Sequence, residues 1–254
     1  LTLTLTQRRN TARTNMDRIN GLMSKGVDWG AMMKVADISP AVQAHLRDVY
    51  ALLGGAVALA AVGAYIHVLT HMGGILTTLA MFGMMFWLAS VDKAEKGKRL
   101  AIFSAFATLQ GLSIGSLIDV ILHVDPSILV TALMGTVAVF VCFSASAIFS
   151  KRRSWLYIGG FLGSMVSLMF WGSILSRFLG GSSVMFNVNL YLGLAVFCGY
   201  VIFDTQMIIE KASAGDRDSI WHALGLFVDF VAIFVRIAII LLKNSGKGKK
   251  RERR

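Results

Sequence analysis

Cysteine is scarce in this chain of 254 residues, and the two that occur, Cys142 and Cys198, both lie within long apolar runs. This argues against a disulfide framework and provides no spacing for a zinc site. The sequence also lacks a short apolar segment followed by a small-residue cleavage site, so we expect no cleaved signal peptide. The first membrane span is therefore expected to act as the targeting signal.

Charged residues are nearly absent from the apolar runs, although the chain carries a net charge of +11. Hydrophobic residues make up 56% of the sequence, and the mean hydropathy is +0.66. A soluble domain is about 45–50% apolar even when glycine is counted, so we expect an integral membrane protein with one domain. The basic residues flank the runs, which indicates membrane topology and contact with anionic lipid rather than binding of nucleic acid.

Apolar runs long enough to cross a bilayer are predicted to be helices, because backbone groups in lipid must hydrogen bond to one another. Ser39 and Pro40 form a helix-start signal before the first of them. The expected fold class is an all-α integral membrane protein, a seven-helix transmembrane bundle. Its spans are expected at residues 49–69, 74–90, 100–122, 128–149, 155–175, 189–210 and 220–242.

Basic residues alternate between the loops, which predicts a cytosolic N-terminus. The region up to Arg47 has seven Lys and Arg, the first and third loops have none, and the second loop has four. We divide the chain into a basic cytosolic region at 1–47, a membrane domain at 48–242 and a basic tail at 243–254. Seven full spans would place the tail on the far side, whereas a last segment that dips in and returns would leave it cytosolic. We also expect Met16 to be the true start, a disordered basic tail at 1–15 being the alternative.

Two acids, Asp204 and Asp229, lie inside consecutive apolar runs. An acid at such a position disfavours membrane insertion by about 2.5–3.5 kcal/mol or more, so it is a functional candidate by default. At a rise of ~1.5 Å per residue, Asp204 lies ~8 Å and Asp229 ~13 Å inside the same end of antiparallel helices. We therefore expect the two acids to share a site, with Arg236 two turns deeper on the same face as Asp229.

Two carboxylates close together in a low dielectric resist double ionisation, so the pair is expected to hold one proton and to respond to cytosolic pH. Without that proton it offers oxygen ligands to a hard cation such as calcium, in the weak and transient binding that a conducting site needs. The alternative is that each acid pairs with a donor on another helix, the candidate latch residues being Arg236 and His222. Three further acids are expected at a cytosolic mouth that concentrates cations, namely Glu210, Asp216 and Asp218.

Pairs of glycines four residues apart occur in the third and fifth runs, at Gly111 and Gly115 and at Gly159 and Gly163. This spacing lets helix backbones approach closely in lipid, so we interpret these glycines as helix contacts.

The last two runs and several shorter stretches resemble the Bax inhibitor-1 branch of the transmembrane Bax-inhibitor-motif family. The stretches that carry the resemblance are ISPAVQAHLRDVY, VDPSILVTALMGT, FDTQMIIEKASAGDRDSIWHALGLFVDF and the basic tail. The resemblance implies a multi-pass endoplasmic-reticulum protein that leaks calcium in a pH-dependent way and restrains stress-induced apoptosis. It also implies a bundle with the last helix central and a di-aspartyl pH sensor, which falls on Asp204 and Asp229.

The resemblance further implies partners, namely Bcl-family apoptosis regulators, the unfolded-protein-response sensor kinase and calcium-release channels. Some bacterial relatives latch the first acid to an arginine in the second span, but the second span here has no Arg or Lys. We expect no enzyme activity and no cofactor, with calcium as the permeant ion. The basic residues of the tail are expected to contact lipid or partners; they are Lys247, Lys249, Lys250, Arg251, Arg253 and Arg254.

Three other functions compete with a calcium leak. A non-conducting interaction protein would use the acids only to hold the bundle together. An intramembrane aspartyl protease could use two membrane acids to activate water, but its glycine-containing motif is missing here. A proton-coupled carrier would show a repeat or a broken helix, and neither is evident.

Overall fold

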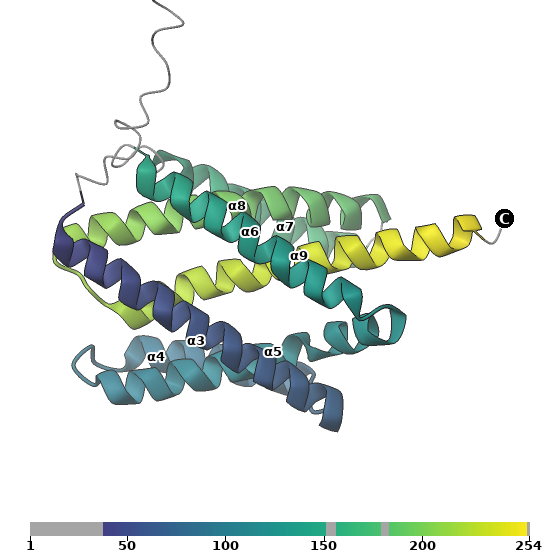
Figure 1. Cartoon of the computed structure of the whole chain (residues 1–254), viewed down its shortest axis with the longest axis horizontal. Helices are drawn as coiled ribbons and strands as arrows, with labels where there is room; N and C mark the ends of the chain where they lie inside the picture. The colour runs from purple at the N-terminus through teal and green to yellow at the C-terminus, as the bar shows by residue number, and fades with distance from the viewer. Residues whose placement is uncertain (1–37, 151–155, 179–182, 253–254) are drawn as a thin grey trace, which may run out of the picture. The chain divides into compact units, whose positions relative to one another are not determined.

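The computed structural model describes residues 38–150, 156–178 and 183–252, and these residues form seven α-helices and one short 3-10 helix (Figure 1). None of the described residues forms a strand. The elements are α3 (Pro40–Thr70), α4 (Ile75–Ser90), α5 (Lys96–Val124), α6 (Ser127–Phe149), η2 (Leu156–Ile158), α7 (Gly159–Phe178), α8 (Ser183–Ser213) and α9 (Ser219–Glu252).

Six of these elements are long and apolar enough to cross a membrane, with η2 and α7 counted as one segment, so the chain is a multi-pass membrane protein. The exception is α4, which has 16 residues. At ~1.5 Å per residue it is ~24 Å long, less than the ~30 Å hydrocarbon core of a bilayer. The expected all-α membrane fold is confirmed, with six long spans and one shorter apolar helix.

The first helix begins where the sequence predicts. The Ser39 hydroxyl accepts a hydrogen bond from the Val42 amide at 3.4 Å, and Pro40 occupies the first turn. The last helix, α9, is continuous from Ser219 to Glu252, so it does not dip into the membrane and return. The N-terminal region up to Asp37, the loop at 151–155, and the side chains of the tail from 246 onward lie outside the described residues. The predictions made for them are therefore untested.

Close packing of α3 against α5 depends on glycine. An added Cβ on Gly111 would lie 2.0 Å from the Ala60 carbonyl oxygen, and one on Gly115 would lie 2.3 Å from the His67 Cβ. Either contact is impossible for a real side chain, so only glycine lets the two backbones approach this closely. Between α7 and α8, a Cβ on Gly159 would lie 2.4 Å from the Phe203 ring. The predicted role as close helix contacts is confirmed for Gly111, Gly115 and Gly159, whereas a Cβ on Gly163 would meet only the Tyr200 hydroxyl, at an ordinary 3.8 Å.

Helix α9 contacts α3, α5, α6 and α8. Figure 1 shows its yellow ribbon running between α8 on one side and α3 with α5 on the other. Phe227 makes edge-to-face contacts with Phe103 and Phe106 of α5, with ring centroids 6.3 and 6.0 Å apart, while Phe230 meets Phe140 of α6 at 5.5 Å. Aromatic side chains thus fix both flanks of the α9 segment that carries Asp229.

Candidate functional site: an acid pair between two helices

Asp204 and Asp229 face each other from the antiparallel helices α8 and α9. Asp204 lies nine residues before the end of α8 at Ser213, and Asp229 lies ten residues after the start of α9 at Ser219. At ~1.5 Å per residue both acids are therefore ~14–15 Å from the end of the bundle where the two helices connect. The sequence estimate placed them nearer that end because it took the helices to end where the apolar runs end.

The side chains of Asp204 and Asp229 interact directly where α8 meets α9. Two ionised carboxylates this close would repel each other, so the contact favours a state in which the pair holds one proton. Asp229 is buried, with 4% of its surface exposed, and Asp204 is half-buried. Oδ2 of Asp229 is buried without a hydrogen-bond partner among the described residues, which leaves an oxygen available to a proton or a cation.

A glycine makes room for this contact. A Cβ on Gly225, which lies one turn before Asp229 on α9, would be 3.2 Å from Oδ2 of Asp204. Any larger side chain at 225 would therefore compete with the Asp204 carboxyl group for the same space. Gly225 could not be singled out beforehand, because glycine is frequent in membrane helices.

Two neutral polar side chains of α8 form hydrogen bonds to other helices next to the acids, on the side that faces the loop between α8 and α9. The buried Thr205 hydroxyl is 3.3 Å from the Tyr50 hydroxyl of α3, and the Gln206 amide donates to the Ala147 carbonyl of α6 at 3.3 Å. These bonds tie α8 to α3 and to α6 next to Asp204. Their effect is to fix the rotation of α8 so that Asp204 faces α9.

A buried ion pair closes the same end of the bundle. Nη1 of Arg99, near the start of α5, lies 2.8 Å from Oδ2 of Asp218, and the two side chains are only 5% and 6% exposed. The other oxygen of Asp218 accepts the Trp221 amide at 3.1 Å, so the same carboxylate also caps the N-terminus of α9. Asp218 was expected to line a cytosolic mouth that concentrates cations, but the structure places its carboxylate inside a contact between α5 and the start of α9.

Two further contacts lie beside this ion pair. Nε2 of His45 on α3 is 2.9 Å from Nδ1 of His222 on α9, and both rings are buried. The exposed Lys93 donates a 2.9 Å hydrogen bond to Asp216, and this ammonium group holds the pKa of the Asp216 carboxyl below its usual range. Together these contacts join the start of α3, the α4–α5 loop and the start of α9.

Neither candidate latch residue reaches an acid among the described residues. His222 pairs with His45, as above. Arg236 donates from Nη1 to the Ala232 carbonyl at 2.9 Å, and its guanidinium carbon lies 4.4 Å from the centre of the Phe197 ring. It also packs against Gly193 of α8. Glu210, the third residue expected at the mouth, is half-buried near the end of α8.

Comparisons with known proteins agree with this architecture. A family model described as "Inhibitor of apoptosis-promoting Bax1" matches residues 42–246. Bax inhibitor 1 of Arabidopsis thaliana is 50% identical over 223 residues, which cover 88% of this chain and 90% of the relative. Bax inhibitor 1 of Oryza sativa is 46% identical and that of Homo sapiens 41%, each over 92% of this chain and at least 95% of the relative. The chain belongs to the Bax inhibitor 1 family. This membership implies a role in the regulation of cell death.

The residues of this Bax inhibitor 1 family member that could not be identified from the sequence are mainly the contact partners of residues that could. His45 and Arg99 could not be recognised because each lies in a polar stretch before an apolar run, where exposure to solvent is the usual outcome. A signal did exist for Asp218, because an aspartate directly before an apolar helical run is typical of an N-cap.

Proposed function

We propose that this chain is a regulator of cell death in the endoplasmic-reticulum membrane that acts as a pH-sensitive calcium leak and modulates the unfolded-protein response. The observation that carries the proposal is the contact between Asp204 and Asp229 within the membrane-spanning part of the bundle. An acid inside a membrane is costly, and two acids in contact serve no packing purpose that apolar side chains would not serve better.

The pair responds to pH through the proton that it holds. With one proton, a carboxyl group of one helix donates to the carboxylate of the other and holds α8 against α9. Loss of that proton leaves two anions that repel each other and that together attract a divalent cation. Gain of a second proton removes the negative charge and with it the affinity for the cation. The protonation state of one site thus sets both helix contact and cation binding.

Calcium would meet few protein oxygens at this site. The carboxylate oxygens of both acids, including the unpaired Oδ2 of Asp229, are available, whereas calcium ordinarily takes six to eight oxygen ligands. Water must supply the rest, so binding is weak and release is fast. Weak binding is what a permeant ion requires.

The proposed topology is a seven-helix transmembrane bundle with α9 central and the N-terminus in the cytosol. The contacts of α9 with four other helices support a central position. The orientation is supported by the loops. Basic residues gather at the end where α3 starts, as in Lys93, Lys98 and Arg217, while the turns at 71–74 and 125–126 at the opposite end have none. In this topology the continuous α9 carries the basic tail to the far side.

The proposed partners are Bcl-family apoptosis regulators, the unfolded-protein-response sensor kinase and calcium-release channels. The matching family is described as an inhibitor of apoptosis-promoting Bax1, which supports the first of these. A non-conducting membrane protein that restrains apoptosis through partner binding is the second candidate. It is favoured by the contacts at the end of the bundle, since the ion pair and the histidine pair are both buried between the helices there.

Calcium flux into liposomes that contain the purified protein separates the two candidates. We expect flux that varies between pH 6 and pH 8, and we expect Asp204→Asn and Asp229→Asn each to abolish that variation, because asparagine keeps the shape but cannot titrate. Asp119→Asn is the matched control, since Asp119 lies on α5 near the opposite end, beside His123. Flux that is absent from the wild type would favour the non-conducting alternative, whereas flux whose pH dependence is unchanged in both variants would reduce the two acids to structural roles.

A further inference from the structure

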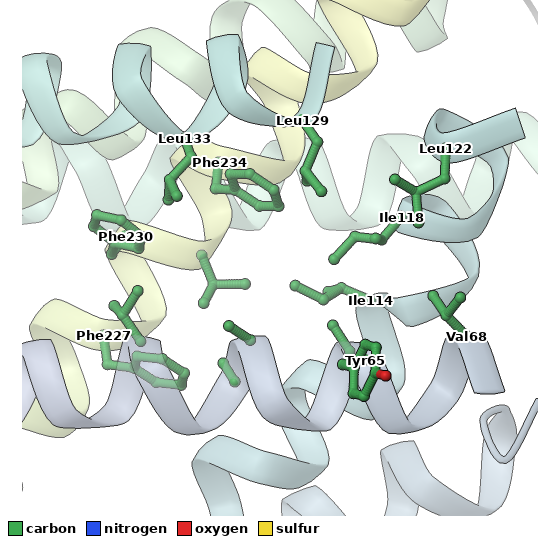
Figure 2. Close-up of a pocket in the computed structure, with 15 residues that line it drawn as sticks. Tyr65, Val68, Ile114, Ile118, Leu122, Leu129, Leu133, Phe227, Phe230 and Phe234 are labelled. Carbon is green, nitrogen blue, oxygen red and sulfur yellow. The ribbon is translucent and has the colours of Figure 1, made fainter. Parts of the chain in front are cut away.

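An apolar cavity of about 330 Å³ lies between α3, α5, α6 and α9 (Figure 2). Of its fifteen lining residues, Tyr65 alone has a polar side chain; the others are aliphatic or are phenylalanine. Figure 2 shows the labelled side chains of all four helices arranged around a common space, with the Tyr65 hydroxyl at its edge. An engineered cavity of about 150 Å³ with such a lining stays dry and binds benzene. This larger cavity has room for a longer hydrocarbon.

The cavity opens toward the surface that faces lipid. Tyr65 of α3 and Leu133 of α6, which stand on opposite walls, are 64% and 42% exposed. The floor consists of buried or half-buried residues of α9, including Phe227, Phe230 and Phe234. In a bilayer, the molecules that can enter from this side are lipids or other membrane-embedded apolar groups.

The dimensions of the cavity match one leaflet. Along α3 it extends from Val57 to Val68, a distance of eleven residues. At ~1.5 Å per residue this is ~16 Å, close to half of the ~30 Å hydrocarbon core. Tyr65 lies five residues before the end of α3 at Thr70, so its hydroxyl is near the polar boundary of the membrane. Tyrosine prefers that depth because its ring is apolar and its hydroxyl can hydrogen bond to lipid.

We propose that this cavity is a binding site for one acyl chain of a bilayer glycerophospholipid, drawn from the leaflet next to the α3–α4 and α5–α6 turns. The chain lies against Phe227, Phe230 and Phe234, and the Tyr65 hydroxyl donates a hydrogen bond to the ester carbonyl. Phe230 directly follows Asp229 in the sequence, so a bound chain braces the part of α9 that carries this acid. This lipid site does not depend on the proposed calcium leak, and the experiment that tests it does not measure calcium flux.

The test uses the full chain in phosphatidylcholine vesicles that contain a phosphatidylcholine with a diazirine in the middle of one acyl chain. After irradiation, we expect cross-links on α3 and α6 residues that line the cavity, at a density at least fivefold above that on the exposed face of α7. Ala61→Trp, which places an indole in the opening, should reduce the cross-links on α6 at least fivefold. Tyr65→Phe should shift the cross-links along α6 or reduce them about twofold.

Two matched controls lie on the same helices. Ala58→Trp on α3 and Met134→Trp on α6 add the same bulk at exposed positions that do not line the cavity. Both should leave the labelling of the cavity unchanged. If Ala61→Trp does not fold, Leu133→Trp fills the cavity from the opposite wall.

Three results would overturn the proposal. If the cross-links are spread evenly over α7 and the cavity, and neither filling substitution changes them, the probe is labelling only bulk lipid around the protein. A photoactivatable sterol that labels the cavity and displaces the phosphatidylcholine probe would make the occupant a sterol. Cavity residues that cross-link only to a second protein chain would make the cavity a protein interface.

Discussion

The buried ion pair between Arg99 and Asp218 provides the sharpest test of how the end of the bundle is held together. Both side chains are almost fully buried, at 5% and 6% exposure, and their charged atoms are 2.8 Å apart. Nε of Arg99 has no hydrogen-bond partner among the described residues, so Asp218 provides the main compensation for its charge. Removal of either partner alone therefore leaves an uncompensated buried charge.

The size of the effect follows from that geometry. Breaking a buried pair by removing one partner typically costs about 3–5 kcal/mol, whereas replacing both with neutral side chains is often neutral. Asp218→Asn is the preferred single change, because asparagine still caps α9 at the Trp221 amide. Arg99→Met removes the other charge and keeps an apolar side chain of similar length. We expect each single variant to lose about 3–5 kcal/mol and the double variant to lie within about 1 kcal/mol of the wild type.

The assay is thermal unfolding of the four proteins in detergent, followed by tryptophan fluorescence at one scan rate. For a chain of this size each kcal/mol shifts the midpoint by about 2–4 °C, so single variants should unfold on the order of 10 °C earlier. The exposed pair of Lys93 and Asp216 is the control, and Lys93→Met should cost less than about 1 kcal/mol. A double variant as unstable as the sum of the two single variants would refute the reasoning, because the two charges would then be independent.

Two further predictions test other parts of the bundle. Gly111→Ala should destabilise the protein by several kcal/mol, because its Cβ would lie 2.0 Å from the Ala60 carbonyl oxygen and the backbones of α3 and α5 would have to separate. Gly55→Ala on α3, where a Cβ meets nothing within 4 Å, should instead be neutral or stabilise by about 0.5–1 kcal/mol, and equal unfolding midpoints for the two variants would contradict this account. Arg236→Gln should keep the wild-type pH profile of calcium flux in liposomes, because its guanidinium group contacts Ala232 and Phe197 rather than an acid, and a lost profile would show that Arg236 reaches the acid pair in another conformation.

The helices and the acid pair were predictable from the sequence because their signals are local. Apolar runs identify the spans, Ser39 and Pro40 mark the first helix, and antiparallel neighbours joined by a short loop place Asp204 and Asp229 at similar depth. The sequence estimate of depth was less accurate because α8 and α9 extend beyond the apolar runs, to Ser213 and from Ser219. Polar residues continue a helix once it leaves the hydrocarbon, and hydropathy alone does not detect them.

The partners of the polar residues were not predictable, because they depend on which helices are neighbours. Arg99 is one of four basic residues in the second loop, and nothing local distinguishes the buried one from the exposed Lys93. His222 was considered as a partner for an acid, yet it bonds to His45, which is 177 residues away in the sequence. Such pairings require the packing of α3, α5 and α9 to be known first.

The ion pair and the acid pair are mechanically linked, because both involve the same rigid helix. Asp218 caps the start of α9, and Asp229 lies eleven residues further along it, ~16 Å at the usual rise. A shift of α9 that separates Asp229 from Asp204 therefore also acts on the contact between Asp218 and Arg99. Part of the free energy needed to open the acid pair is the free energy of that ion pair. Under the proposed function, a variant neutral at both 99 and 218 is therefore expected to be as stable as the wild type and to separate Asp204 from Asp229 at a different pH.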